Sequence, residues 1–100
     1  MLIHLVCWKY KSETNAAARD LHRNMLRALS GLVDENESLD VGEDILHLDR
    51  SFDTGLVIRF NDREALDRYT YHPDHQKVAA FGKEIAERVV SVDFFTNGSL

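Results

Sequence analysis

The pattern of hydrophobic and polar positions divides the chain into four strand-like segments and two helical regions. Residues 2–10 are largely apolar on both faces of an extended chain, which is typical of a sheet covered on each side. A domain this small usually covers one sheet face with its own helices, so the second apolar face indicates a partner chain. One face carries Leu2, His4, Val6, Trp8 and Tyr10, and the other carries Ile3, Leu5, Cys7 and Lys9.

The next segment has the signals of an amphipathic helix. It follows Ser12-Glu13-Thr14-Asn15, residue types that favour the N-cap position, and Gly31 suits the position just after a helix end. His22 lies beside the apolar stripe, so we interpret it as a surface or flanking histidine, with a pocket role as the less favoured alternative. The stripe itself consists of Ala17, Ala18, Leu21, Met25, Ala28, Leu29 and Leu32.

The middle of the chain predicts a β-hairpin. After a polar turn at 34–38, residues 39–48 have the pattern of a strand, and residues 54–60 have the pattern of the next one. The connection at 49–53 suits a hairpin, so the two strands should be antiparallel neighbours. We expect His47, close to this connection, to be exposed to solvent.

The last third predicts a helical region broken by the only proline. Asn61-Asp62-Arg63-Glu64 resembles a capping box with Asn61 as the N-cap. Pro73 ends the first helix, because the residue before a proline is pushed out of the α region, and the helix resumes after it. Gly82 in this second helix indicates close packing. The buried stripe is predicted as Val78, Phe81, Ile85 and Val89, and the last strand as residues 89–95.

The order strand–helix–strand–strand–helix–strand, followed by a polar tail at 96–100, is typical of a ferredoxin-like α+β fold. We therefore predict one domain over residues 1–100, with a four-stranded antiparallel sheet and helices on one face. A second copy of the chain would cover the other face and give a dimeric α+β barrel. The helix-covered face would bear His4, Val6, Trp8 and Leu56, and the dimer face Leu5, Cys7 and Val57.

Composition narrows the functional classes. The net charge is −5 and the basic residues do not cluster, which argues against binding to nucleic acid or to an anionic membrane surface. No stretch approaches the ~20 apolar residues of a membrane span, and the apolar N-terminus is too short for a signal peptide. Cys7 is the single cysteine, so no disulfide forms within one chain and we expect a reducing, cytoplasmic location.

The run Tyr69-Thr70-Tyr71-His72-Pro73-Asp74-His75 concentrates proton-transfer groups. A neutral imidazole with a pKa of about 6.5 suits His75 as a general base. Tyr69 could donate a hydrogen bond to an enolate or carbonyl oxygen. The structural alternative is a helix corner, in which His75 bonds a backbone carbonyl and Tyr69 anchors the break. Residue types alone favour this structural alternative.

The same run raises the question of a metal site. His72 and His75 with Asp74 between them could supply ligands, but a closed site needs three or four, and no further ligand has motif spacing. We therefore predict no metal and expect His72 at a helix N-cap or exposed. His4 on a covered strand face is more simply a hydrogen-bonded core histidine than a catalyst.

Taken together, these residues resemble the stress-responsive dimeric α/β-barrel (Dabb) family. The resemblance extends from Ile3 to about Phe95, and the Tyr-x-x-His-Pro-x-His run is its most specific part. The other carriers are His4-Leu5-Val6 with Trp8-Lys9, Val57-Ile58-Arg59-Phe60-Asn61-Asp62 leading into Ala65-Leu66, and Val92-Asp93-Phe94.

The functions of that family are diverse and mostly undefined, and they include a plant polyketide cyclase that closes a ring by an aldol condensation without a cofactor. The catalytic pair of that cyclase is the tyrosine and the last histidine of the motif, which implies Tyr69 and His75 here. Its first-strand pocket histidine implies His4. A further pocket histidine on its third strand corresponds to Thr54, which puts the same substrate in doubt.

We therefore expect a homodimeric stress-responsive barrel protein of undefined activity that binds a small apolar or aromatic ligand without a cofactor. The alternative is a cofactor-free polyketide cyclase or carbonyl lyase, with His75 as base and Tyr69 as donor. A cofactor-free monooxygenase is a weaker option that rests on fold analogy alone. The expected pocket residues besides that pair are His4, Val6, Trp8, Thr54, Leu56, His72 and Phe81.

Overall fold

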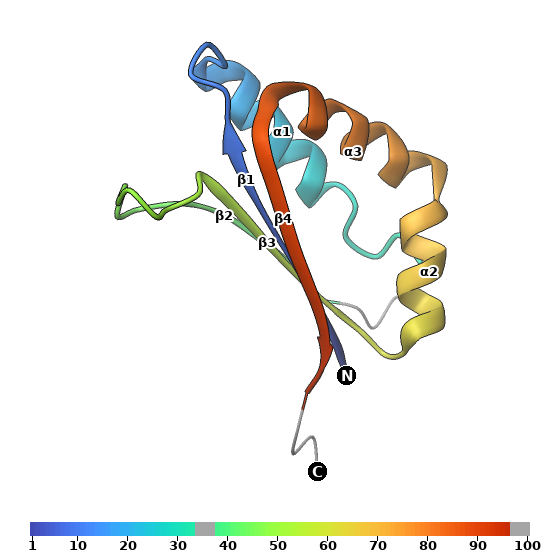
Figure 1. Ribbon diagram of the computed structural model, residues 1–100. Helices are drawn as coiled ribbons and strands as arrows, with labels where there is room; N and C mark the ends of the chain where they lie inside the picture. Colours follow the sequence, from blue (N-terminus) through green and yellow to red (C-terminus); the bar gives the residue numbers. More distant parts are fainter. Residues whose placement is uncertain (34–37, 97–100) are drawn as a thin grey trace.

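The computed structural model describes residues 1–33 and 38–96, in which a four-stranded antiparallel sheet carries three helices on one face (Figure 1). The strand order β2-β3-β1-β4 is the ferredoxin-like arrangement that the sequence predicts. The turn expected at 34–38 and the tail expected at 96–100 lie mostly outside the described residues. In chain order the elements are β1 (Leu2–Tyr10), α1 (Ala16–Arg27), β2 (Ser38–Glu43), β3 (Thr54–Phe60), α2 (Arg63–Tyr71), α3 (Pro73–Ile85) and β4 (Ala86–Phe95).

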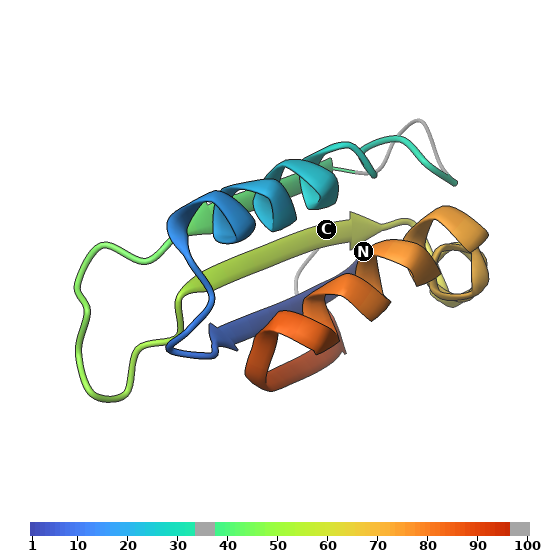
Figure 2. The same cartoon turned by 90° about the horizontal axis from the view of Figure 1, so that it is seen from above.

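The sheet register decides which side chains face the helices. β1 is central, and its Val6 lies opposite Leu56 of β3 and Ser91 of β4. Because side chains alternate along a strand, the helix-covered face also receives Ile58 and Phe60, both fully buried. Seen from above, α1 runs along the β2 side of this face and α3 along the β1 side (Figure 2). The core therefore lies between one sheet face and the three helices.

α1 starts where the sequence predicts, but it turns a different face to the sheet. The Asn15 side chain caps it by accepting a hydrogen bond from the Ala18 amide at 2.9 Å. The helix ends at Arg27, before Gly31, and its buried face is His22, Arg23 and Leu26. Leu21, expected on the buried stripe, is 52% exposed. The prediction of a surface or flanking His22 is wrong: its side chain is fully buried.

β2 is shorter than the predicted strand at 39–48. The chain leaves the sheet after Glu43, where the Asp44 amide donates to the Asp53 carbonyl at 2.9 Å and closes a longer loop. The Asp44 carboxylate also accepts a hydrogen bond from the His47 amide at 2.7 Å, and this local bond competes with further pairing of β2. His47 itself has a positive φ of 53° and is exposed, as expected.

The helix corner at Pro73 is present, with two shifts from the predicted positions. Asp62 rather than Asn61 caps α2, accepting from the Ala65 amide at 2.8 Å. His72 caps α3, since its Nδ1 accepts from the Asp74 amide at 3.1 Å and Pro73 occupies the first turn. Val89 was predicted on the helical stripe, but β4 already begins at Ala86 and Val89 is exposed. No helix in the described part of the chain is long and apolar enough to span a membrane.

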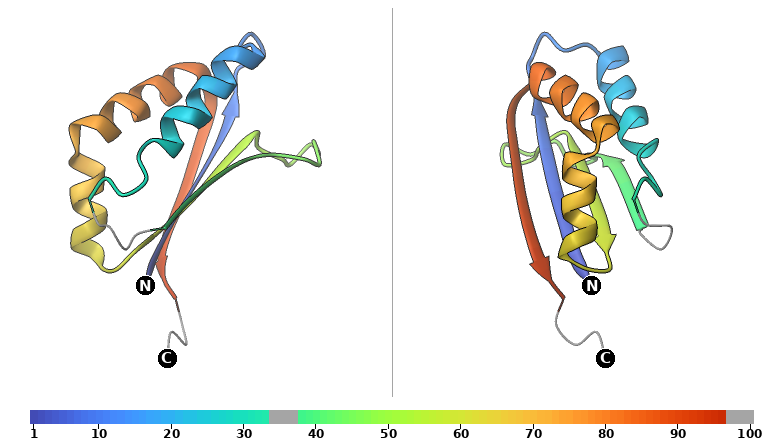
Figure 3. Two further views of the ribbon diagram at one scale, coloured as in Figure 1. Left: turned by 180° about the vertical axis from the view of Figure 1, so that it is seen from behind. Right: turned by 90° about the vertical axis from the view of Figure 1, so that its right-hand side faces the viewer.

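The second face of the sheet is not covered by any of the described helices (Figure 3). It carries Leu5, Cys7 and Val57, all half-buried, which alternate with the helix-facing residues. Burial raises the pKa of the Cys7 thiol, as expected for a small hydrophobic residue and not for a reactive thiolate. On β4 the same face exposes Val90, Val92 and Phe94. We call this surface the open face.

Candidate functional site

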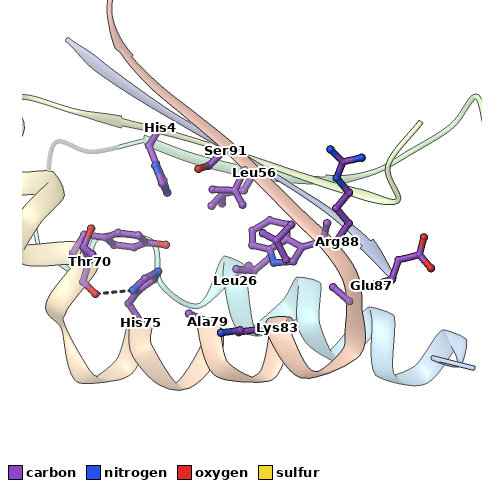
Figure 4. Close-up of a pocket in the computed structure, with 15 residues that line it drawn as sticks. His4, Leu26, Leu56, Thr70, His75, Ala79, Lys83, Glu87, Arg88 and Ser91 are labelled. Carbon is purple, nitrogen blue, oxygen red and sulfur yellow. Dashed lines mark hydrogen bonds between the residues drawn. The ribbon is translucent and has the colours of Figure 1, made fainter. Parts of the chain in front are cut away.

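A cavity of about 590 Å³ lies between α3 and the helix-covered face of the sheet (Figure 4). We call it the α3 cavity. Most of its wall is apolar, with Val6, Trp8 and Leu56 from the sheet. Polar side chains from three elements gather at one end: His4 from β1, Tyr69 from α2 and His75 from α3. A volume of this size is typical of small-molecule sites.

The helix corner sets the orientation of His75. Its Nδ1 lies 3.0 Å from the Thr70 carbonyl oxygen, which can only accept, so Nδ1 carries the hydrogen. In the neutral ring Nε2 is then the acceptor. Burial is the main cause that lowers the pKa of His75, with the Thr70 bond opposing it and the nearby His4 and His72 adding to it. His75 is therefore a neutral base near pH 7.

Sheet register fixes His4. His4 lies opposite Asp93 of β4, and its Nδ1 pairs with the Asp93 carboxylate. A carboxylate accepts hydrogen bonds, so Nδ1 is the donor and Nε2 remains as the second ring nitrogen. In Figure 4 the His4 ring extends from the sheet into the α3 cavity, toward the helix corner. Asp93 thereby orients the imidazole from behind.

Tyr69 is the most buried member of the polar group, with 1% of its surface exposed. Its ring centroid lies 4.3 Å from that of His75 and 6.0 Å from that of His4, and Phe60 packs against it at 5.3 Å. The three side chains predicted at the site therefore come together at one end of the cavity. Held by packing on both sides, Tyr69 has little rotamer freedom.

Three other expected pocket residues do not line the α3 cavity among the described residues. Thr54 is buried in a hydrogen-bond network, where its hydroxyl meets the Tyr10 hydroxyl at 2.8 Å. His72 caps α3 at the outside of the corner. Phe81 packs beside His22, with ring centroids 6.1 Å apart. Each residue lies on or next to an element that borders the cavity, but its position on that helix or strand directs its side chain away from the cavity.

The sequence did not predict a buried polar network behind Trp8. The Tyr10 hydroxyl lies 2.7 Å from Nδ1 of His22, and Arg23 donates to the Thr54 hydroxyl at 3.0 Å. Burial, and secondarily the charge of Arg23, lowers the pKa of His22 to about 4. Its Nε2 has no hydrogen-bond partner among the described residues. The network supports Trp8 in the cavity wall, because the Trp8 and His22 rings pack edge-on with their centroids 5.0 Å apart.

Gly82 is the sequence signal that points to this network. A Cβ at this position would lie 2.6 Å from His22 Nε2, closer than such atoms approach, and 3.0 Å from Trp8 Nε1, which is a tight contact. α3 can therefore approach the sheet this closely only because residue 82 has no side chain. The predicted close packing at Gly82 is confirmed.

A second cavity of about 490 Å³ adjoins the first and shares His4 and Thr70 with it. Its lining includes Arg63, Asp67 and Asp93, so it is more polar. His4 thus separates an apolar cavity from a charged one. Within residues 1–33 and 38–96 no three His, Cys, Asp or Glu side chains gather closely enough to hold a metal ion.

The fold and the cavity define a ferredoxin-like α+β protein with a small-molecule-sized cavity between its sheet and α3. Residues 2–96 match the model of the Stress responsive A/B Barrel Domain (Dabb) family. The chain belongs to this family. No curated protein is significantly similar to it in sequence.

Several solved structures share the fold. A dimeric ferredoxin-like protein of unknown function from Thermobifida fusca has a TM-score of 0.86 and 18% identity, covering 95% of this chain and 90% of that one. A hydroxynitrile lyase from Passiflora edulis has a TM-score of 0.84 and 18% identity, covering 99% and 95%. A second dimeric ferredoxin-like protein of unknown function, from Jannaschia sp. CCS1, has a TM-score of 0.80 and 22% identity, covering 95% and 98%. At these identities the likeness is one of fold.

Proposed function

We propose that this Dabb protein binds a small apolar or aromatic ligand in the α3 cavity. The observation that carries the proposal is the combination of an apolar wall with three polar rings at one end. Burial of apolar ligand surface supplies affinity at about 25 cal/mol per Å², and the polar end orients the ligand. A ligand hydroxyl can donate to the acceptor Nε2 atoms of His4 and His75, and a ligand carbonyl or hydroxyl oxygen can accept from the Tyr69 hydroxyl.

Filling the cavity from α3 tests this proposal. Ala79 lines the α3 cavity, whereas its neighbour Ala80 does not, so Ala79→Trp and Ala80→Trp form a matched pair. Binding of 2-naphthol, followed by its fluorescence, should weaken at least tenfold in Ala79→Trp and stay unchanged in Ala80→Trp. Equal binding by both variants would exclude the α3 cavity as the site.

The geometry also supports a catalytic alternative, a cofactor-free cyclase or carbonyl lyase. His75 Nε2 would take a proton from a carbon next to a carbonyl, and Tyr69 would donate a hydrogen bond to the enolate oxygen that forms. In a cyclase the enolate carbon then attacks a second carbonyl of the same molecule, forming the carbon–carbon bond, and the new alkoxide takes the proton back. The neighbour from Passiflora edulis is a lyase, which is an analogy of fold.

Proton removal can be measured without knowing the natural substrate. The methyl protons of 2-acetonaphthone exchange with deuterium through the enolate, and NMR follows the loss of the methyl signal. We expect the protein to accelerate the exchange and the His75→Ala variant to lose at least a hundredfold of it, while 2-naphthol still binds against the apolar wall. The exposed His47→Ala variant is the control. Retained exchange in His75→Ala would remove His75 as the base.

We further propose that the protein is a homodimer that packs through the open face, at Leu5, Cys7 and Val57. Exposed Val90, Val92 and Phe94 on the same face support this, because contiguous apolar patches on a sheet usually mark an interface. The dimeric neighbours have the same fold. We also propose a cytoplasmic location, in keeping with the single cysteine.

A further inference from the structure

α3 presents one residue per turn to the α3 cavity. His75, Ala79 and Lys83 all line it, and positions four apart lie on the same face of a helix. Eight residues at 1.5 Å rise separate the backbones of His75 and Lys83 by about 12 Å. The backbone of Lys83 therefore lies about two helical turns along α3 from the polar rings, with Ala79 between them.

Lys83 places a positive charge beside the cavity. In Figure 4 its ammonium lies back along α3 beside Ala79, whereas the Arg88 guanidinium and the Glu87 carboxylate extend away from the cavity. Among the described residues Lys83 forms no ion pair within 4.0 Å. The charge is thus available to a bound molecule.

We infer that Lys83 recognises an anionic group of the ligand. The ligand class is an elongated apolar or aromatic molecule with a carboxylate at one end and a carbonyl or hydroxyl oxygen at the other. This inference rests on the proposed ligand site and adds the polarity of its two ends. A carboxylate over an apolar wall is less screened than one in bulk water, so the ammonium favours an acid over its neutral ester. Lys83 is exposed, so salt weakens the effect.

Two probes with the same skeleton isolate the charge. 6-Hydroxy-2-naphthoate carries a hydroxyl and a carboxylate at opposite ends, and its methyl ester lacks only the negative charge. The wild-type protein should bind the acid about fivefold more tightly than the ester at low salt, which is the scale of an exposed ion pair. The preference should fall as sodium chloride is raised to 0.5 M.

The variants assign that preference to one side chain. Lys83→Met should bind acid and ester equally, with the affinity for the ester unchanged, and Lys83→Arg should keep the preference. Lys77→Met, on the same helix but outside the cavity lining, is the matched control and should behave as wild type. An acid preference that survives in Lys83→Met, or that is absent in wild type while the ester binds, overturns the inference alone. Absence of binding by both probes in wild type overturns the proposed ligand site as well.

Discussion

Burial lowers the pKa of two imidazoles, and the two differ in what their free nitrogens can reach. His22 is enclosed on all sides, and its pKa falls to about 4. His75 is half-buried, its pKa also lies below the ordinary value of about 6.5, and its Nε2 belongs to a ring that lines a cavity. The same physical cause therefore gives a structural histidine in one place and a candidate base in the other.

The pKa of His75 sets the pH dependence of any proton abstraction. A base acts in its neutral form, and His75 is neutral above its lowered pKa. Exchange of 2-acetonaphthone should therefore be constant from pH 8 down to about 6.5, the ordinary histidine value, and decline only at lower pH as the imidazole is protonated. A decline that begins above pH 7 would contradict a buried His75 as the base.

His22 makes the fold sensitive to acid. Its pKa is about 6.5 in the unfolded chain and about 4 in the folded one, so the unfolded chain binds more protons between these values. The stabilising contribution is complete above pH 6.5 and is lost as the pH falls toward 4. A shift of this size corresponds to about 3 kcal/mol of unfolding free energy.

Urea unfolding at pH 7 and at pH 4 measures this loss. In His22→Gln the drop in unfolding free energy between the two pH values should be smaller by about 3 kcal/mol. In the exposed His47→Gln it should match wild type. An equal drop in unfolding free energy in wild type and His22→Gln would show that protonation of other groups causes the acid sensitivity.

Individual elements were predictable wherever local chemistry decides them. Pro73 and the cap residues located the corner of α2 and α3, and alternation located β3. The phase of α1 was not predictable, because its burial follows the hydrogen bonds of His22 and Arg23 to Tyr10 and Thr54, which lie far away in sequence. A polar residue on a helix is predicted to be exposed unless its buried hydrogen-bond partner is known.

The same reason divides the candidate site. Tyr69 and His75 are marked by a local motif, and His4 by its strand position, so their place in the cavity lining could be predicted. Lys83 was not expected in the lining, because its place there depends on the cavity that forms between α3 and the sheet. Thr54 and Phe81 were wrongly expected in its lining, because the side of the wall on which each side chain falls depends on packing.

Gly82 provides a test of the packing between α3 and the sheet. Alanine normally stabilises a helix relative to glycine by about 1 kcal/mol. Here the added methyl group would collide with His22 and Trp8, so Gly82→Ala should instead destabilise the fold by about 1–3 kcal/mol. Thermal unfolding measures it, and Ala80→Gly, on the exposed side of α3, calibrates the propensity effect alone. A stabilised Gly82→Ala would refute the close approach.

At the scale of the whole molecule, the open face leaves apolar side chains exposed to solvent. Three helices cover one side of the sheet, whereas the other side exposes the apolar β4 residues Val90, Val92 and Phe94. We expect a solution mass near twice 11.5 kDa at micromolar concentration. Val92→Asp should give a monomer by sedimentation, while Leu21→Asp, on the exposed outside of α1, should leave the dimer intact. A dimeric Val92→Asp variant would exclude this face.

The relief of the open face would favour one arrangement of the two copies in the proposed dimer. Gly42 lies opposite Gly55, and Gly55 lies opposite Cys7, so two neighbouring strands lack side chains there. A small hollow lined by these three residues results on the β2 side. Val90 and Val92, which we call the ridge, are exposed on the β4 side. A two-fold axis across the strands would stack ridge on ridge. An axis along the strands sets each ridge into the partner's hollow and fills space.

Gly55→Val separates this arrangement from the stability of one copy. A Cβ at Gly55 meets no atom within 4 Å, and valine favours strands by up to about 1 kcal/mol, so the isolated monomer should become more stable. In the proposed dimer the valine would occupy the hollow into which the partner's Val90 and Val92 would fit, so the dissociation constant should rise at least tenfold. Sedimentation equilibrium gives the constant, and urea unfolding below that concentration gives the monomer stability. If Gly55→Val dimerised as tightly as wild type, the hollow would lie outside the interface. That result would favour the two-fold axis across the strands.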